Sequence, residues 1–390
     1  MIQASRKQWI KFSIVLVLYL IFLIWLQSWL GVVVVPFIFD AYISKKIPWT
    51  WWKKSKNKTV LAVMSWVDAI VFALVAVYFV NLYFFQNYVI PSSSLEKSLL
   101  VGDYLFVSKM SYGARIPQTP LHMPLTQHTL PVFNCKSYLD WVHWDYKRVG
   151  GLGKVELNDI VVFNFPAGDS VATAVPAEDL YRLSYQAGQQ LSQPVDMSRL
   201  TLEQQRQVYD FYYQAGRKYI DENPQMYGKI ITRPVDRREN YVKRCVGLPG
   251  QTLEIKNRII YLDGKANKEP DNVQYRYFVK TKGMLPDDLC HELGISQEDL
   301  MMYYTEESVY TMPLTEKAKA ALLARKDLVV SIENTPDDDA GGLYPVNKLT
   351  GWTVDNYGPV WIPKNSFNSF RIRGLASFGI RMPYVIHAGK

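Results

Sequence analysis

The residues with the clearest chemical potential are three consecutive serines, Ser92, Ser93 and Ser94. They follow Ile90-Pro91, just beyond the end of a long apolar segment, and a strand-like run at 104–108 comes soon after them. A serine hydroxyl is protonated at neutral pH and needs a neighbouring base before it can act as a nucleophile. Without such a base, the same serines could simply form a polar exit from a membrane helix.

Few residues in the sequence are candidates for the base that would take the proton of one of these hydroxyls. The chain has five histidines and none of them lies in a recognisable catalytic motif; they are His122, His128, His143, His291 and His387. A lysine held neutral by burial is the other common base. Lys243 lies among apolar and β-branched residues in the run YVKRCVGLPG at 241–250. An ordinary exposed lysine is the plain alternative.

Three segments resemble one known family. IPSSSLEKSLLVGD at 90–103, NDIVVFNFP at 158–166 and YVKRCVGLPG at 241–250 follow an apolar anchor in that order. Together they closely resemble type I signal peptidases, over roughly residues 60–165 and 240–265. The resemblance implies a membrane serine endopeptidase that removes signal peptides from exported preproteins after small residues, through an acyl-enzyme formed by a serine–lysine dyad.

Motif by motif, the resemblance also implies the roles of individual residues. Ser94 is the expected nucleophile and Lys243 the general base. The Ser94 backbone N–H and the Ser92 hydroxyl are the expected donors to the oxyanion, which needs preorganised hydrogen bonds. The family implies no cofactor and no metal. Its partners would be secreted preproteins, membrane lipid and the export translocon, with no nucleic acid.

The chain departs from the family pattern downstream of the lysine. The usual Gly-Asp-Asn-Arg motif is absent, and Asp355-Asn356-Tyr357-Gly358 is only an echo that lacks the arginine. The tail at 364–390 contains no acidic residue, so one hypothesis is a truncated chain with a tail read in the wrong frame; a divergent terminus is the other. The alternative function is an impaired relative that binds preproteins or acts as a scaffold.

Two other enzyme classes share part of the pattern. Ser94-Leu-Glu-Lys97 fits the S-x-x-K motif of penicillin-binding proteins, and Ser366-Phe-Asn368 could serve as their S-x-N element. No Lys-Thr-Gly follows, however, and a nucleophile so close to a membrane segment fits that class poorly. A soluble self-cleaving repressor is disfavoured by the apolar segments.

Apolar segments near the N-terminus must position this chemistry. After residues 1–11, the run 12–39 has no charge and is long enough for one transmembrane helix, which needs about 20 residues. A basic loop at 40–59 carries six lysines against three cations before the run. Positive loops stay in the cytoplasm, so this loop is expected inside and the N-terminus outside. A second span at 60–86 then leads to an extracytoplasmic domain at 87–390 in a multi-pass protein of the cell membrane.

The extracytoplasmic domain is expected to be mainly β, with a sheet or barrel core and helical insertions. Short runs of β-branched and aromatic residues predict strands, at 104–108, 160–165, 241–246, 252–256 and 259–262. Asn257-Arg258 and Asp263-Gly264 predict turns. Insertions are expected at about 167–239 and 270–350, with helices at 203–220, 287–304 and 314–325.

Composition adds limits to this interpretation. Cys135, Cys245 and Cys290 are odd in number and widely spaced, which is not typical of a disulfide framework. His122, His128, Cys135 and His143 do not have the spacing of a tetrahedral metal site. The net charge is +8, but the basic loop accounts for most of that excess, so no nucleic-acid partner is needed to explain it.

Overall fold

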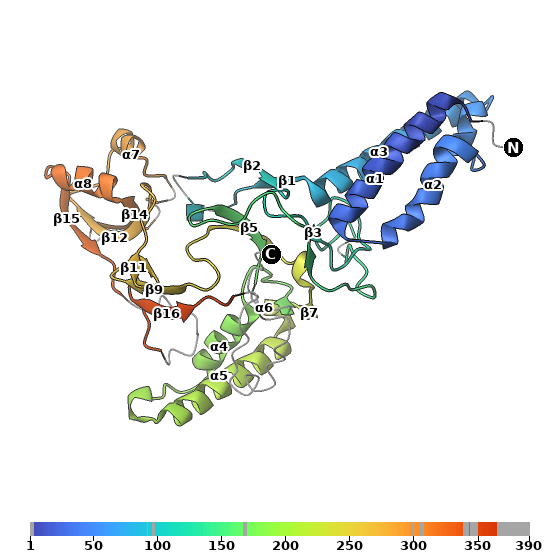
Figure 1. Ribbon diagram of the computed structural model, residues 1–390. Helices are drawn as coiled ribbons and strands as arrows, with labels where there is room; N and C mark the ends of the chain where they lie inside the picture. Colours follow the sequence, from blue (N-terminus) through green and yellow to red (C-terminus); the bar gives the residue numbers. More distant parts are fainter. Residues whose placement is uncertain are drawn as a thin grey trace. The chain divides into compact units, whose positions relative to one another are not determined.

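The computed structural model describes most of the chain. The described residues are 4–91, 93–95, 98–133, 135–166, 170–297, 299–300, 302–304, 308–337, 343 and 350–364. They fall into two compact units, the first comprising residues 4–88 and 104–154 and the second comprising residues 89–103 and 155–364. Figure 1 shows the helices and strands of both units.

Two long apolar helices dominate the first unit. Helix α1, Arg6–Leu26, begins with a capping box in which Ser5 and Gln8 bond each other's backbone N–H. Helix α3, Lys58–Tyr83, begins at Asn57, whose side chain accepts from the N–H of Thr59. Both helices are long and apolar enough to cross a membrane.

The apolar run 12–39 is not one helix, unlike the expectation from the sequence. Helix α1 ends where Gln27 takes a left-handed conformation with φ of 50°. A tight 3-10 turn at Leu30–Val34, helix α2 at Val35–Phe39 and a wider helical turn at Asp40–Ser44 follow. An uninterrupted apolar composition predicts burial in lipid, but it does not show where the backbone changes direction. The sequence therefore predicted a single span for a run that the structure divides after Leu26.

The rest of the first unit consists of short strands beside the helix ends. Strand β1, Phe85–Val89, pairs with β2, Tyr104–Ser108, and β3, Arg115–Ile116, pairs with β4, Lys147–Arg148. A small core forms from Leu26 of α1 with Ala114 and Val149 beside β3 and β4. The β3–β4 pair is therefore fixed to the end of α1.

In the second unit, two strand pairs flank a helical hairpin. Strand β5, Ile160–Asn164, pairs antiparallel with β8, Asn240–Arg244, and β6, Ser170–Ala172, pairs with β7, Ile230–Thr232. In the chain, three helices lie between β6 and β7. They are α4, Leu180–Leu191, α5, Leu202–Glu222, and the short α6, Pro224–Tyr227. Helices α4 and α5 can approach closely because Gly188 and Gly216 have no side chain at their contact. A Cβ on either glycine would overlap backbone atoms of the other helix.

A four-stranded sheet follows directly in the chain. Its order is β11-β10-β9-β16, with β9 at Thr252–Lys256, β10 at Ile259–Leu262, β11 at Lys265–Ala266 and β16 at Tyr357–Trp361. Asn257 and Arg258 both have positive φ, as the favoured two-residue hairpin turn requires. The predicted strands 252–256 and 259–262 and both predicted turns are therefore confirmed.

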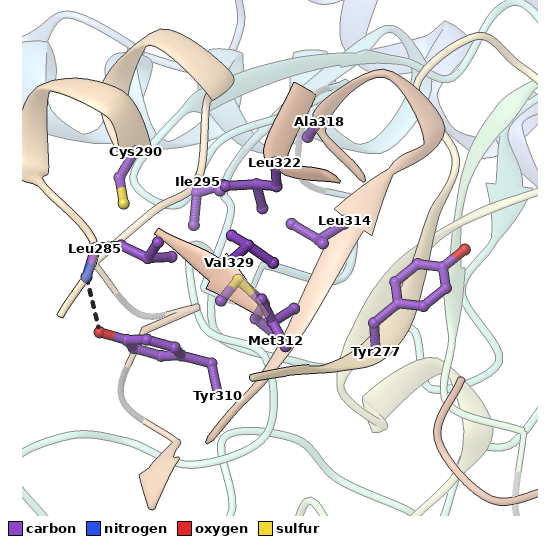
Figure 2. Packing of buried hydrophobic residues seen from close by; sticks show 11 residues of the cluster. Tyr277, Leu285, Cys290, Ile295, Tyr310, Met312, Leu314, Ala318, Leu322 and Val329 are labelled. Atoms are coloured by element: carbon purple, nitrogen blue, oxygen red, sulfur yellow. Dashed lines mark hydrogen bonds between the residues drawn. The ribbon is translucent and has the colours of Figure 1, made fainter. Parts of the chain in front are cut away.

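A second four-stranded sheet has the order β13-β14-β12-β15. Its strands are β12 at Gln274–Thr281, β13 at Tyr303–Tyr304, β14 at Val309–Thr315 and β15 at Val329–Asn334. Helices α7, Asp287–Leu293, and α8, Glu316–Ala324, cover it. Figure 2 shows their shared core, in which Met312, Leu314 and Leu322 are almost fully buried.

The fold expected from the sequence holds in part. The described residues combine helices with small sheets of two or four strands, instead of a mainly β body. The segment at 167–239 carries the helical hairpin, and the described part of the segment at 270–350 combines the predicted helices, as α7 and α8, with a four-stranded sheet that was not expected. The helix expected at 287–304 ends at Leu293 because Gly294 takes the left-handed conformation of a helix C-terminus.

Candidate active site

The serine-bearing loop is closed by hydrogen bonds at its base. The N–H of Ile90 donates to the Asp103 carbonyl at 3.0 Å, and the N–H of Gly102 donates to the Ile90 carbonyl at 2.9 Å. The Ile90 side chain is only 2% exposed. Gly102 has φ of +90°, which glycine adopts readily, and the Asp103 carboxylate accepts from the N–H of Leu100 at 2.8 Å. These contacts hold the loop ends together.

Ser94 lies in a single 3-10 turn, Ser93–Leu95, within this loop. Just beyond it, the N–H groups of Ser98 and Leu99 both donate to the Leu95 carbonyl, at 2.9 and 2.8 Å. The Ser94 side chain is exposed to solvent.

Lys243 comes to the same loop from a different part of the second unit. It lies in β8, opposite Val161 of β5. Its Nζ is 2.5 Å from the Oγ of Ser94, although the two residues are 149 positions apart in the sequence. Thus the nucleophile and base suggested by the sequence are in direct hydrogen-bond contact.

The surroundings of Lys243 favour the neutral amine. Partial desolvation lowers its pKa below the ordinary lysine value, because removing water penalises the charged form. The side chain nevertheless remains exposed, so it is less deeply buried than the sequence suggested. In the described parts of the chain no salt bridge involves Lys243, and no carboxylate there holds it in the charged form.

Arg244, the next residue, makes a second connection to the serine loop. Its Nη2 donates to Ser98 Oγ at 2.9 Å, while its Nη1 donates to the Asn158 carbonyl at 2.9 Å. Cys245 and Asn158 continue the backbone pairing beyond β5 and β8 through an N–H···O bond of 2.7 Å. The loop is thus attached to β8 at both Ser94 and Ser98. Sequence reasoning missed this role, because nothing local in the sequence pairs Arg244 with a hydroxyl.

Several sequence-predicted residues lie outside the described ones. These include Ser92, the expected oxyanion donor, and Lys97, Ser366 and Asn368 of the alternative motif. The echo motif is described, and it lies at the β9–β10 turn. Asp355 accepts from Arg258 Nε at 2.7 Å, and Asn356 Oδ1 accepts from the N–H of Asn257 at 3.1 Å.

The histidines near residue 130 have local partners. His122 Nδ1 lies 3.0 Å from the Met123 carbonyl, and His128 Nδ1 lies 2.7 Å from the hydroxyl of Thr129. Among the residues that the structure describes, no group of three histidine, cysteine, aspartate or glutamate side chains could hold a metal ion.

Comparison with known proteins points to one family. The family model of signal peptidase, peptidase S26, matches residues 63–302. Signal peptidase I of Helicobacter pylori (strain ATCC 700392 / 26695) is 45% identical over 76 residues, which are 19% of this chain and 23% of that protein. Signal peptidase I of Bacillus caldolyticus is 46% identical over 41 residues, 10% of this chain and 22% of that protein.

A third relative extends the same similarity. Signal peptidase IB of Staphylococcus aureus (strain Mu50 / ATCC 700699) is 37% identical over 43 residues, 11% of this chain and 22% of that protein. The matched segments therefore span less than a quarter of the length of these relatives. No solved structure matches the chain.

Proposed function

Since the chain belongs to the signal peptidase family, peptidase S26, we propose that it is a membrane serine endopeptidase that removes signal peptides from exported preproteins. The observation that carries the proposal is the distance of 2.5 Å between Lys243 Nζ and Ser94 Oγ. A nucleophile and its base within hydrogen-bond reach are the structural signature of covalent catalysis.

In the proposed reaction, neutral Lys243 takes the proton of the Ser94 hydroxyl while Oγ attacks the scissile carbonyl. The tetrahedral intermediate collapses, Lys243 gives the proton to the leaving amine, and the signal peptide stays on Ser94 as an ester. Lys243 then activates a water molecule, which hydrolyses the ester and restores the serine. A base serves this cycle best when its pKa lies near the working pH, and the lowered pKa of Lys243 supports that role.

The oxyanion of the intermediate would be held by the Ser94 backbone N–H and the Ser92 hydroxyl. This assignment rests on the family motif at 90–103. The hydrogen bonds that close the loop at Ile90 and Asp103 support it, because donors that are fixed before reaction cost no reorganisation when charge develops.

The architecture of the proposed enzyme follows from its substrate. A signal peptide is itself a membrane segment, so an enzyme anchored by α1 and α3 would keep Ser94 near the membrane surface where the scissile bond emerges. We assign β5, β8, β9, β10 and β16 to a signal-peptidase-like β core outside the cytoplasm, with α4–α5 and the β12–β15 sheet as insertions. Secreted preproteins, membrane lipid and the export translocon are the proposed partners.

The test is cleavage of a preprotein, with small residues before the cut, by the full chain in detergent or liposomes. Ser94→Ala and Lys243→Met should each lower kcat/KM by at least about 10³-fold, which corresponds to about 4 kcal/mol of transition-state stabilisation. Lys280→Met is the matched control, since Lys280 is an exposed lysine on a strand of the same unit, away from the serine loop. It should leave cleavage unchanged.

Two results would contradict the proposal. Full cleavage by the Ser94→Ala variant would place the nucleophile elsewhere. A folded wild-type chain that binds a preprotein without cleaving it would instead support the alternative, an impaired relative that acts as a preprotein-binding or scaffold protein.

A further inference from the structure

The two long helices of the first unit run in the same direction. Their C-terminal ends meet in an aromatic cluster: the Phe22 ring lies 5.1 Å from Phe79 and 5.2 Å from Tyr83, and Trp25 lies 6.3 Å from Tyr83. Phe22 and Trp25 belong to the last turns of α1, and Phe79 and Tyr83 to those of α3. Figure 1 shows the two helices side by side.

The chain between them returns along α1. At one end, the Tyr19 hydroxyl donates to the Gly31 carbonyl at 2.7 Å, and Gly31 lies so close to Leu23 that a Cβ would overlap that side chain. At the other end, Phe39 packs on Phe12 at 5.6 Å and on Trp9 at 6.4 Å. The segment Leu30–Ser44 therefore runs antiparallel to α1, from its C-terminal to its N-terminal part.

From this arrangement we propose that the chain crosses the membrane three times, with its N-terminus in the cytoplasm. If two parallel helices both span a bilayer, the segment that connects them must cross it as well. Leu30–Ser44 is an apolar helical stretch. With five 3-10 residues at about 2 Å each and ten others at about 1.5 Å or less, it reaches roughly 25 Å at most. This is shorter than the hydrocarbon thickness of about 30 Å, a mismatch that a short span meets by local thinning of the bilayer.

The distribution of charge fixes the orientation. Nine cations lie at the same end of the bundle, three in the first two turns of α1 and six between the second pass and the first residue of α3; they are Arg6, Lys7, Lys11, Lys45, Lys46, Lys53, Lys54, Lys56 and Lys58. The turn at the opposite end, residues 27–29, carries no charge. Cations are retained on the cytoplasmic side, where they also face anionic lipid headgroups.

Asp40 lies near the end of the proposed second pass, Leu30–Ser44, and stabilises the turn that follows it. Its side chain is buried and accepts from the N–H groups of Lys46 and Ile47, at 2.9 and 3.1 Å, and from Trp49 Nε1 at 3.0 Å; the Ser44 hydroxyl also donates to it. A buried carboxylate is tolerated when it is hydrogen-bonded in this way. Asp40 therefore fixes the turn from the apolar pass into the basic loop.

This topology differs from the single span at 12–39 at two places that can be measured. Both place residues 45–58 inside and the body after α3 outside. Three passes put the N-terminus inside and expose residues 27–29 outside, whereas one span puts the N-terminus outside and residues 27–29 within the lipid. The difference does not depend on catalytic activity.

The experiment is labelling of single thiols in the full chain with a membrane-impermeant maleimide, in intact spheroplasts and after lysis. Cys135, Cys245 and Cys290 are first replaced by serine, and one thiol is then introduced by Ala4→Cys, Ser28→Cys or Ser55→Cys. A variant that keeps only the exposed Cys135 is the control for the outer side. A fusion of green fluorescent protein to the N-terminus of the full chain reports the location of that end independently.

We expect positions 4 and 55 to react only after lysis, positions 28 and 135 to react in intact spheroplasts, and the fusion to fluoresce. Labelling of position 4 in intact spheroplasts, or a dark fusion, would overturn the proposal. So would a thiol at position 28 that reacts only after lysis or in neither preparation, because residues 27–29 would then not emerge outside.

Discussion

Arg244 Nη2 donates to Ser98 Oγ at 2.9 Å, four residues beyond Ser94, while the adjacent Lys243 contacts Ser94 itself. Two consecutive residues of β8 therefore hold the serine loop at two points. Arg244 also spans from Ser98 to the Asn158 carbonyl. Because Arg244 bonds Ser98 and the Asn158 carbonyl, we expect it to position the serine loop and to take no part in proton transfer.

Removing this second attachment should slow catalysis without abolishing it. A hydrogen bond from a charged group is worth about 1.5–3 kcal/mol at most, and less when it is exposed, so Ser98→Ala should lower kcat about fivefold with little change in KM. Ser98→Thr keeps the hydroxyl and should restore most of the rate. Steady-state cleavage kinetics of the three proteins measure this. A rise in KM alone would mean that Ser98 contacts substrate instead.

Arg244→Lys tests the same attachment from the other side. A lysine has no planar fork and cannot reach Ser98 and the Asn158 carbonyl together. We expect a loss of kcat at least as large as that of Ser98→Ala. The double variant should be little worse than Arg244→Lys alone, since both changes break one interaction. Additive losses in the cycle would contradict a shared role.

The pH dependence of cleavage should report the Lys243 amine. Desolvation lowers its pKa below the ordinary value of 10.5. Only the neutral amine accepts the serine proton, so kcat/KM should increase with pH and level off above the lysine pKa, with a midpoint below 10.5. A pH profile of kcat/KM at constant ionic strength tests this. A midpoint near about 6.5 that persists in all active variants would indicate a histidine base instead.

The ion pair between Arg258 and Asp355 should contribute to stability and not to catalysis. Both side chains are largely buried, at 13% and 19% exposed, and the pair joins the β9–β10 turn to the chain before β16. Asp355→Asn should lower the free energy of unfolding by about 1–3 kcal/mol and leave kcat/KM within about twofold. Thermal unfolding in detergent and cleavage kinetics check both parts. Asp271→Asn, at an exposed carboxylate of the same unit, is the control. A large loss of kcat at a temperature where the variant is folded would give the 355–358 segment a catalytic role.

Lys109 should destabilise the first unit at neutral pH. It is largely buried, and burial together with the nearby charges of Arg115 and Arg148 lowers its pKa to about 8. Between pH 8 and 10.5 the unfolded chain therefore binds more protons than the folded one, and stability should increase with pH across that window. Lys109→Met should raise the free energy of unfolding by about 2–3 kcal/mol at pH 7. This gain should shrink as the pH rises.

Thermal unfolding of Lys109→Met and wild type at pH 7 and pH 9.5 measures that effect. Lys154→Met, at an exposed lysine of the same unit, should change neither value. A constant difference between Lys109→Met and wild type at both pH values would show that packing, and not the charge, is responsible.

Local features of the fold were predictable from the sequence. The β9–β10 hairpin follows from two short β-branched runs around Asn257-Arg258, because turn residues and strand alternation act over a few positions. The sheet of β12, β14 and β15 was missed: β12 pairs with both β14 and β15, and each pairing joins residues tens of positions apart. Helix α8 begins at Glu316 because Leu314 and Thr315 are part of β14.

The membrane segment shows the same limit. Composition identified residues 12–39 as apolar, but the reversal after Leu26 depends on packing of Gly31 and Phe39 against α1. Hydropathy measures preference for lipid and contains no information about which apolar surfaces of the chain pack together.

The sequence by itself determined the family, through three motifs in a fixed order, and with it the identity of Ser94 and Lys243 as the proposed dyad. Only the tertiary structure decided that their side chains lie 2.5 Å apart, that Arg244 holds Ser98, and that the N-terminal apolar run folds back along α1. The physical reason is that residue types and spacing record chemical capability and local backbone preference. Contacts between segments distant in sequence depend on packing and desolvation, which exist only in the folded chain.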